Sequence, residues 1–460
     1  MNKLNNLYYG QIDDDDLLID EFKEIIKSIT FELKYNSDYL NSGEKQEGNN
    51  DKLEMENFNK DFEKNKIYNI FVDKEKIGQM FFPRYNHTNA SDDLKNKKPG
   101  GFVLFAYDFK FNETYIQDYI TKIQELSQKY MKLPLGLSVD EEGGTVCRVS
   151  NYHRPSKFPS PQEIYNKSGI QGILDIDQEK RDLLRKFYLN INLAPVADIS
   201  YNSSDYIYDR TLGRSPEESA NYIEKDVEGY VEDNFTCCAK HFPGYGNNID
   251  THGDIAIDNR DYETFQKEDF LTFKAAIAKK IPMILVSHNI VKCKDNKYPA
   301  SLSPAWHEIL RKELNFSGLI LTDDLSMGAI KKYTGEESEA VLAVNAGNDI
   351  LLTSDYYIHL DAVIKAAKSG KIKEEIINKA CRRIIAWKFQ YLNATEAIPD
   401  EDGEKGEEPG SKTLIVVVSI LGGVIVVGCI IVLIMFLKKK NNNNITDDVK
   451  NIDGDVLIEN

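Results

Sequence analysis

The chain has 460 residues, enough to bury a large core in one α/β barrel with additions or in two or three smaller domains. Its formal net charge of −17 excludes the basic groove of a nucleic-acid-binding protein, and much of this charge lies in acidic runs such as "DDDD" (13–16) and "EDGEKGEE" (401–408). The six cysteines show no C-x-x-C spacing, which argues against zinc-ribbon and disulfide-scaffold folds.

Residues 1–65 are polar and rich in Asn, Lys and Glu, with a single amphipathic stretch at 17–33. This composition provides little core of its own, so we predict a polar N-terminal extension. Residues 1–20 contain no apolar h-region, and the sequence therefore shows no secretory signal.

From residue 66 to 392 the pattern changes to short apolar runs separated by amphipathic stretches such as 115–131 and 262–280. The apolar runs are 101–107, 133–140, 191–199, 235–242, 282–290, 318–325 and 349–354. Apolar strands that alternate with helices are typical of a parallel sheet covered on both sides. The number of units over this length predicts an α/β fold, a TIM-type (β/α)8-like barrel, and disfavours an open doubly wound sheet.

Polar side chains close most of these apolar runs. They are Asp140, Asp198, Lys240 with His241, His288 and Asp323. In a barrel the carboxyl ends of all strands converge on one face, whereas an open sheet gathers only the pair at its switch point. We therefore expect these side chains to line one pocket.

A charge-free segment at 413–437 follows an acidic stretch, 393–412, which we predict to be a flexible stalk. The charge-free segment is long enough to cross ~30 Å of hydrocarbon, and we predict a single-pass transmembrane helix. "KKK" begins a short polar tail, 438–460, and basic flanks favour the cytoplasmic side, which places the large domain outside the cytoplasm. Because no signal peptide is visible, a tail-anchored cytoplasmic domain is the alternative.

The segment "KHFPGYGNNIDTHGD" (240–254) carries Lys240, His241, Asp250 and His252. A zinc site would need three or four ligands, and no H-x-x-x-H pair or cysteine cluster accompanies the two histidines. Its "GYG" lacks the further glycine and helix start of a phosphate loop. Asp250 can hydrogen-bond the His252 imidazole and fix its tautomer for proton transfer, although an ordinary solvated loop remains open. We predict no metal and no cofactor.

The run that ends in Asp323 supplies a second carboxylate. A buried carboxylate at a strand end is costly unless it is paired or functional. Asp324 is the rival, but neighbouring side chains on a strand point to opposite faces, so only one of the two should face the pocket. A nucleophilic carboxylate plus a proton donor is the minimum set for glycoside cleavage with retention.

Six motifs in unbroken order give a more specific indication. They are "SVDEEGGTVCRVS" (138–150), "INLAPVADI" (191–199), "YDRTLGRSPEE" (208–218), "KHFPGYG…DTH" (240–252), "PASLSP" (299–304) and "LTDDLSMGAI" (321–330). Together they resemble glycoside hydrolase family 3, most closely its β-N-acetylhexosaminidase (NagZ-like) branch, over residues 66–392. Two departures fall on one loop: Tyr245 stands where the branch generally has a second histidine, and the stretch from Gly246 to Asp250 is a residue shorter than usual.

The resemblance implies a set of catalytic residues. Asp323 would attack the anomeric carbon and form a glycosyl-enzyme. His252 would protonate the departing oxygen and later activate water, and Asp250 would orient His252. Lys240 and His241 would hydrogen-bond the hydroxyls of the sugar.

The resemblance also implies that Asp140, Arg148 and Arg210 grip the N-acetylglucosamine ring and its acetamido arm. The predicted function is a membrane-tethered retaining β-N-acetylhexosaminidase that hydrolyses terminal N-acetylglucosamine from glycans or peptidoglycan fragments. A non-catalytic glycan-binding surface protein and a glycoside phosphorylase are the alternatives. The partners expected are a carbohydrate substrate and the membrane, with no nucleic acid, and the oligomeric state stays open.

Overall fold

The structure, a computed structural model, describes residues 73–248, 256–327, 330, 334 and 337–392. All of them belong to the first of two compact units of the chain, residues 1–397. The predicted extension, stalk, transmembrane segment and tail lie outside the described residues, so their boundaries stay predictions.

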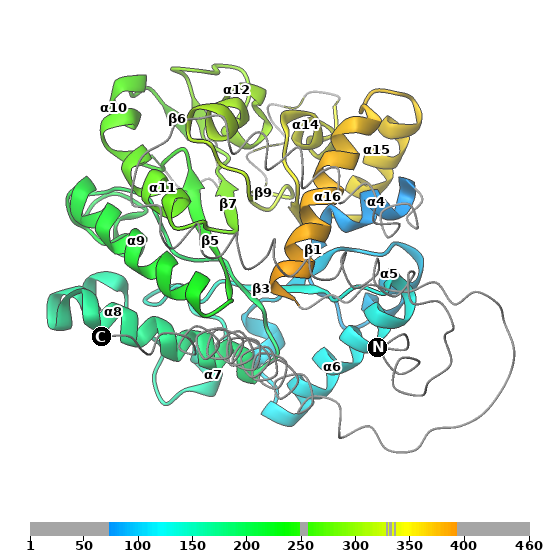
Figure 1. Cartoon of the computed structure of the whole chain (residues 1–460), viewed down its shortest axis with the longest axis horizontal. Helices are drawn as coiled ribbons and strands as arrows, with labels where there is room; N and C mark the ends of the chain where they lie inside the picture. The colour runs from blue at the N-terminus through cyan, green and yellow to red at the C-terminus, as the bar shows by residue number, and fades with distance from the viewer. Residues whose placement is uncertain (1–72, 249–255, 328–329, 331–333, 335–336, 393–460) are drawn as a thin grey trace, which may run out of the picture. The chain divides into compact units, whose positions relative to one another are not determined.

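Strands and helices alternate along the described chain (Figure 1). The strands are β1 (Phe81–Pro83), β2 (Gly101–Val103), β3 (Gly136–Val139), β4 (Ile191–Asn192), β5 (Thr236–Phe242), β6 (Ile257–Asp258), β7 (Met283–Val286), β8 (Ile290–Val291), β9 (Leu319–Thr322) and β10 (Leu351–Thr353). The α-helices are α4 (Asp73–Gln79), α5 (Ala90–Asn96), α6 (Glu113–Met131), α7 (Ser150–His153), α8 (Pro161–Lys186), α9 (Pro216–Glu232), α10 (Tyr262–Lys267), α11 (Asp269–Ala278), α12 (Pro304–Glu308), α14 (Glu339–Ala346), α15 (Tyr356–Lys368) and α16 (Glu374–Tyr391). Short helical turns are η2 (Ala106–Phe109), η3 (Tyr208–Arg210), η4 (Ala300–Leu302) and η5 (Ile309–Glu313).

The strands β2, β3, β4, β5, β7 and β9 form one parallel six-stranded sheet in that order. β1 pairs in parallel with β10, and single bridges join this pair to the two edges of the sheet, Arg84 to Val103 on one side and Leu321 to Ile350 on the other. β6 and β8 form a separate short ladder. Because the strands of the main sheet are all parallel, their carboxyl ends lie on the same side of the fold.

The predicted fold class needs a correction. We expected a TIM-type (β/α)8-like barrel with a C-terminal transmembrane helix, but the continuous ladder has six strands, and the β1–β10 pair is attached by single bridges alone. The physical reason is local: β1 and β10 have three residues each and pair with each other, which leaves one bridge from the residue next to each of them to the neighbouring edge strand, β2 or β9. What the structure supports is the parallel α/β half-barrel.

The membrane part of that prediction is not supported either. Within the described ranges, no helix combines the length and the apolar character needed to cross a bilayer. The segment 413–437, on which the prediction rested, lies outside those ranges. The extracytoplasmic placement of the large domain depended on the same segment and stays a prediction.

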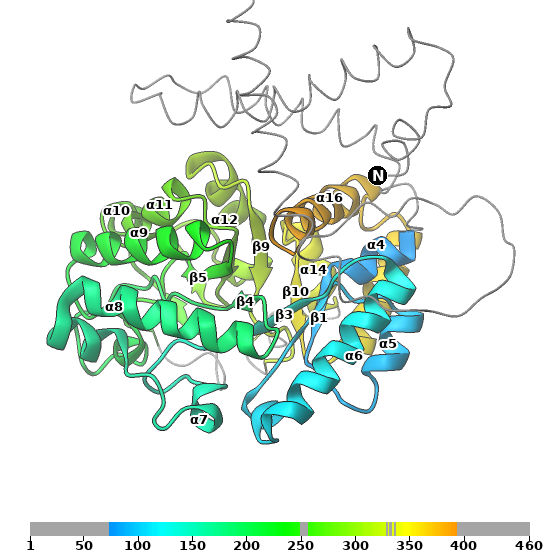
Figure 2. The ribbon, with the colours of Figure 1, turned by 60° about the horizontal axis from the view of Figure 1, so that its bottom comes forward.

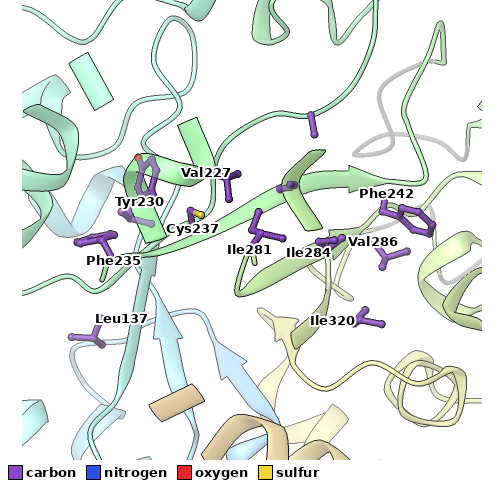
Figure 3. Close-up of a cluster of buried hydrophobic side chains, with 14 of the residues drawn as sticks. Leu137, Val227, Tyr230, Phe235, Cys237, Phe242, Ile281, Ile284, Val286 and Ile320 are labelled. Carbon is purple, nitrogen blue, oxygen red and sulfur yellow. The ribbon is translucent and has the colours of Figure 1, made fainter. Parts of the chain in front are cut away.

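Side chains of the sheet alternate between two buried clusters. Ile284 of β7 faces the cluster that includes helices α9 and α11, whereas Met283, one residue earlier, faces the other cluster. The adjacent Cys237 and Cys238 of β5 divide in the same way. Figure 3 shows Cys237 and Ile284 in the first cluster together with Tyr230 of α9. Both faces of the strands are buried, which explains why the sequence shows apolar runs instead of alternation.

Helices α8 and α9 pack side by side on the sheet (Figure 2). α9 begins after the capping residue Ser215 and has Pro216 at its first position, both strong helix-start signals. The buried stripe of α9 is mostly apolar but contains Asp226, and that of α8 contains Asp177 and Lys180. Charged residues in a buried stripe are unusual unless they are paired.

Candidate active site

The candidate site lies at the carboxyl ends of neighbouring parallel strands. Asp140 directly follows β3, and Lys240 and His241 belong to the last part of β5. Asp198 lies on the segment after β4, and Asp323 directly follows β9, which is separated from β5 by β7 alone. The parallel order of the strands therefore brings the ends of these segments to one side of the sheet, as active sites in α/β folds require.

Glu142 is the centre of a buried ion-pair network. Its carboxylate accepts hydrogen bonds from Arg210 Nε at 2.9 Å and Nη2 at 2.8 Å, and Lys240 Nζ lies 2.6 Å from its Oε1. The Lys240 ammonium also donates to Asp140 Oδ1 at 2.7 Å. The side chains of Glu142 and Lys240 are only 2% and 4% exposed. Arg210 and Lys240, both predicted to bind the sugar, thus meet at Glu142, which the sequence did not single out, and Asp140 joins them through Lys240.

Opposite charges keep this network ionised despite its burial. Burial by itself would raise the pKa of Glu142, but Arg210 and Lys240 hold the pKa of this carboxyl well below its usual range. Burial likewise opposes the charge on Lys240, yet Asp140 and Glu142 raise the pKa of its ammonium above the ordinary value. These groups are therefore fixed donors and acceptors at neutral pH, so a polar ligand can bind them without reorganising the site.

Arg148 is placed by a backbone clamp on the loop that follows β3. The buried carboxylate of Glu141 accepts the N–H of Arg148 at 2.9 Å and that of Val149 at 2.7 Å. Asn192 of β4 in turn hydrogen-bonds both the N–H and the carbonyl of Glu141. From this loop Arg148 Nη2 reaches to 3.7 Å from Asp140 Oδ2. Of the acidic side chains after β3, Glu141 therefore holds its own loop, whereas Asp140 and Glu142 pair with the cations of the site.

His241 is held in one tautomer. Its Nδ1 lies 2.7 Å from Asp198 Oδ2, and Arg210 Nη2 lies 3.3 Å from its Nε2. Because a guanidinium can only donate, Nε2 accepts and Nδ1 carries the proton that is donated to Asp198. Asp198 also accepts the backbone N–H groups of His241 at 3.1 Å and Tyr245 at 2.7 Å, which fixes the carboxylate itself. The ring of Tyr245 packs edge-on against the imidazole.

Asp323 and Asp324 have different surroundings. The Asp324 carboxylate accepts the N–H of Ser326 at 2.9 Å and the N–H and hydroxyl of Ser354 at 3.0 and 2.6 Å. The Asp324 carbonyl lies 3.1 Å from Nε2 of His288. Asp324 is therefore engaged in fastening the turn after β9 to the segment after β10. The Asp323 carboxylate accepts the N–H of Asp324 at 2.8 Å, and its role as the nucleophile stays a prediction.

The predicted acid/base residues Asp250 and His252 lie in the segment 249–255, outside the described residues. The structure therefore does not test their placement relative to Asp323. Within the described ranges, no group of three or more His, Cys, Asp or Glu side chains is arranged to hold a metal ion.

A buried network holds the two chain segments that flank residues 249–255. Asn248 donates to Asp258 Oδ2 at 2.8 Å, and Arg260 donates to Asp258 and to Asp269, each at 2.8 Å. Burial raises the pKa of Asp269 to about 7, although Arg260 acts in the opposite direction. The backbone of Gly244 passes so close to Asp269 that a Cβ there would lie 1.9 Å from Oδ1.

Sequence reasoning missed the roles of Glu141 and Glu142. One signal was present, since three acidic residues in succession after an apolar strand (140–142) exceed what a single binding contact needs. Their partners lie far along the chain, however: Arg210 is 68 positions from Glu142, and Asn192 is 51 positions from Glu141. Pairing over such distances is a property of the folded sheet and cannot be read from local pattern.

The network is suited to a ligand that carries many hydroxyl groups. Fixed ammonium, guanidinium and carboxylate groups provide both hydrogen-bond donors and acceptors at the carboxyl ends of the strands. Charge-assisted hydrogen bonds are roughly twice as strong as neutral ones. A strand-end carboxylate on the same side supplies a nucleophile or a base.

Comparisons with known proteins agree with these observations. Residues 72–387 match the family described as the glycosyl hydrolase family 3 N terminal domain. A Beta-hexosaminidase from Glaesserella parasuis is 33% identical over 307 residues, which cover 64% of this chain and 86% of that protein. A Beta-hexosaminidase from Idiomarina loihiensis is 33% identical over 256 residues, which cover 55% of this chain and 75% of that protein.

A solved structure is similar over a comparable part of the chain. It is a glycoside hydrolase family 3 β-N-acetylglucosaminidase from Paenibacillus sp., with a TM-score of 0.67 and 26% sequence identity. The similarity covers 73% of this chain and 65% of that chain, so the present chain spans just under two thirds of the solved protein.

Proposed function

The chain belongs to glycosyl hydrolase family 3, and we propose that it is a retaining β-N-acetylhexosaminidase that releases terminal N-acetylglucosamine from glycans or peptidoglycan fragments. The enzyme is a glycoside hydrolase, and its substrate is a carbohydrate. The observation that carries this proposal is the ion-pair network in which Arg210 and Lys240 bind Glu142 and Lys240 also binds Asp140. It lies on the side of the sheet where Asp323 follows β9.

In this proposal the charged network holds the terminal sugar. Lys240 and His241 hydrogen-bond ring hydroxyls, while Asp140, Arg148 and Arg210 grip the ring and its acetamido arm. In the structure Nδ1 of His241 donates to Asp198 and Nε2 accepts from Arg210, so a sugar hydroxyl that donates to Nε2 takes the place of Arg210 there. Specific contacts to hydroxyl and amide groups reject analogues that lack them, because the buried partners would then be left unpaired.

The reaction has two steps. In the first, a carboxylate oxygen of Asp323 bonds to the anomeric carbon, the bond from that carbon to the leaving oxygen breaks, and His252 gives its proton to the leaving oxygen. In the second, His252 removes a proton from water, the water oxygen attacks the anomeric carbon, and the bond to Asp323 breaks. Two inversions give net retention of the β configuration.

A histidine acid fits beside a nucleophilic carboxylate. An imidazolium that loses its proton becomes neutral, so the first step leaves no new negative charge next to Asp323. Asp250, two residues before His252 in the sequence, would orient the ring and stabilise its charged form.

An assay of the full chain with an aryl N-acetyl-β-glucosaminide tests the proposal. We expect turnover by the wild type, release of the β anomer as the first product in NMR, and a loss of at least about 10³-fold in kcat for Asp323→Asn. Asp118→Asn, a matched change at an exposed position of α6, serves as the control and should leave kcat unchanged. No turnover by the wild type, or equal turnover by Asp323→Asn, would refute the assignment.

Inorganic phosphate distinguishes hydrolysis from phosphorolysis. In hydrolysis the rate and the free sugar product are the same with or without phosphate. Formation of the glycosyl phosphate at the expense of the free sugar would establish the phosphorylase alternative instead.

A further inference from the structure

A second buried cluster of charges lies behind the candidate site, between α8 and α9. Lys180 of α8 donates to the backbone carbonyl of Glu142 at 2.8 Å and to Asp177 Oδ1 at 2.8 Å. Asp226 of α9 lines the same small cavity as Asp177 and Lys180. The three charged side chains of this cluster are almost inaccessible, with exposed fractions of 3% for Asp177, 4% for Lys180 and 2% for Asp226.

Two carboxylate oxygens in this cluster have no hydrogen-bond donor among the described residues. They are Asp177 Oδ2 and Asp226 Oδ1. Two ionised carboxylates in buried contact repel each other and leave lone pairs unsatisfied. One proton resolves both problems, because a protonated carboxyl group donates to its neighbour. Burial and the neighbouring Asp177 also raise the pKa of Asp226 well above its usual value.

The contacts indicate which carboxyl group carries the proton. Asp177 accepts from the Lys180 ammonium, which stabilises a negative charge on it. Asp226 has no such cation at ion-pair distance within the described part of the chain, because the nearby Arg181 is engaged with Asp233 at 2.7 Å. The proton therefore belongs on Asp226.

No other charged group near the pair changes this assignment. A small cavity of about 10 Å³ beside it is lined by Glu142, Arg210, Tyr222 and Tyr230, among other residues. Glu142 and Arg210 neutralise each other, and burial raises the pKa values of both tyrosines well above the usual value, so they stay uncharged. The cavity also shows that the pair and the sugar-binding network share one buried space.

We propose that Asp226 is a protonated carboxylic acid that hydrogen-bonds Asp177, and that this pair acts through Lys180 to position the turn 140–142 for sugar binding. Asp177 stays anionic and holds the Lys180 ammonium. Lys180 in turn holds the carbonyl of Glu142, whose side chain pairs with the predicted sugar-binding cations. All three are positioning residues without a contact to the sugar, and this second part of the inference rests on the proposed function.

Proton linkage tests the first part without any activity assay. The raised pKa of Asp226 means that the folded chain binds one proton more than the unfolded chain at neutral pH, so this group makes the folded state lose stability as the pH rises. Between about pH 5 and 8 we expect the free energy of unfolding of the full chain to fall with pH more steeply in the wild type than in Asp226→Asn. The difference between the two slopes should correspond to one bound proton.

The exposed Asp118→Asn serves as the matched control and should keep the wild-type slope. Equal slopes for the wild type and Asp226→Asn would overturn the proposal, because Asp226 would then be ionised in the folded protein.

Kinetics test the positioning role. Lys180→Met removes the donor to Glu142, and we expect KM for the aryl N-acetyl-β-glucosaminide to rise at least about tenfold with little change in kcat, as for lost ground-state binding. Asp226→Leu cannot donate to Asp177 and should raise KM in the same direction. Asp226→Asn donates through its amide and should recover most of that loss.

These outcomes separate the two proposals. If the wild type turns over the substrate but Lys180→Met keeps the wild-type KM, the positioning role is refuted and the proposed function stands. If Lys180→Met does not fold, the comparison of Asp226→Leu with Asp226→Asn carries the same test. If the wild type shows no turnover, the proposed function fails while the proton count still decides the state of Asp226.

Discussion

Glu142→Gln is the most direct perturbation of the buried network. The substitution keeps the shape of the side chain but removes a negative charge that Arg210 and Lys240 face at 2.6 to 2.9 Å. Removing one partner of a buried ion pair costs about 3–5 kcal/mol. Because Lys240 keeps Asp140 at 2.7 Å, we expect the lower end of that range, a loss of about 3 kcal/mol in the free energy of unfolding at pH 7.

The size of this loss depends on pH with a definite sign. Arg210 and Lys240 hold the pKa of Glu142 below the ordinary value of 4.5, so in acid the folded chain binds fewer protons than the unfolded chain. The contribution of Glu142 is therefore complete above that ordinary value and is lost as the pH falls through the folded pKa. We expect the difference between wild type and variant to be constant above about pH 6 and to shrink below about pH 4.5.

Urea unfolding of the full chain at a series of pH values measures this difference. Glu375→Gln removes the charge of an exposed ion pair with Lys379 and is the matched control, for which we expect no measurable change. A difference below about 1 kcal/mol at pH 7, or one that does not shrink in acid, would refute the view that Glu142 is the charged centre of the site.

Three further substitutions give distinct expected results. Asp198→Asn releases the tautomer of His241 and should lower kcat/KM on the aryl substrate by about 10- to 100-fold, whereas an unchanged value would show that the ring needs no such partner. Asp324→Ala removes the acceptor of two N–H groups and a hydroxyl, and we expect thermal unfolding to show a loss of about 2–3 kcal/mol with measurable turnover retained, in contrast to Asp323→Asn. Gly244→Ala places a Cβ 1.9 Å from a carboxylate oxygen at a φ of +133°, so we expect a loss of at least about 3 kcal/mol or no soluble protein, and a wild-type melting temperature would contradict the close approach.

Part of the candidate site could be predicted from the sequence because strand ends carry a local signal. An apolar run that closes on a polar residue indicates a buried strand whose end opens on a pocket, and Asp140, Lys240 and Asp323 were found in this way. The choice of Asp323 over Asp324 followed from alternation along the strand and stays a prediction, while the contacts of Asp324 give that residue a structural role. Asp250 and His252 stay predictions.

Other features could not be predicted because they depend on pairing at a distance. The sequence predicted the alternation of strands and helices but not that β1 and β10 would pair with each other and reach the six-stranded ladder through single bridges. Strand length is set by how far neighbouring backbones stay in register, which depends on twist and packing across the sheet. The buried carboxyl groups of α8 and α9 could not be predicted either. Aspartate is usually exposed, and only the packing of the two helices buries Asp177 and Asp226.

The sequence by itself determined the parallel α/β character, the polar ends of the strands and the order of the family motifs. Each of these features depends on residues that are close to one another along the chain. Tertiary structure alone decided which charges meet: Lys240 reaches Asp140 across 100 positions, and Lys240 and Arg210 meet at Glu142 only once the sheet has formed. A charge in a sequence has no partner until folding removes water around it, and it is burial that makes the choice of partner matter energetically.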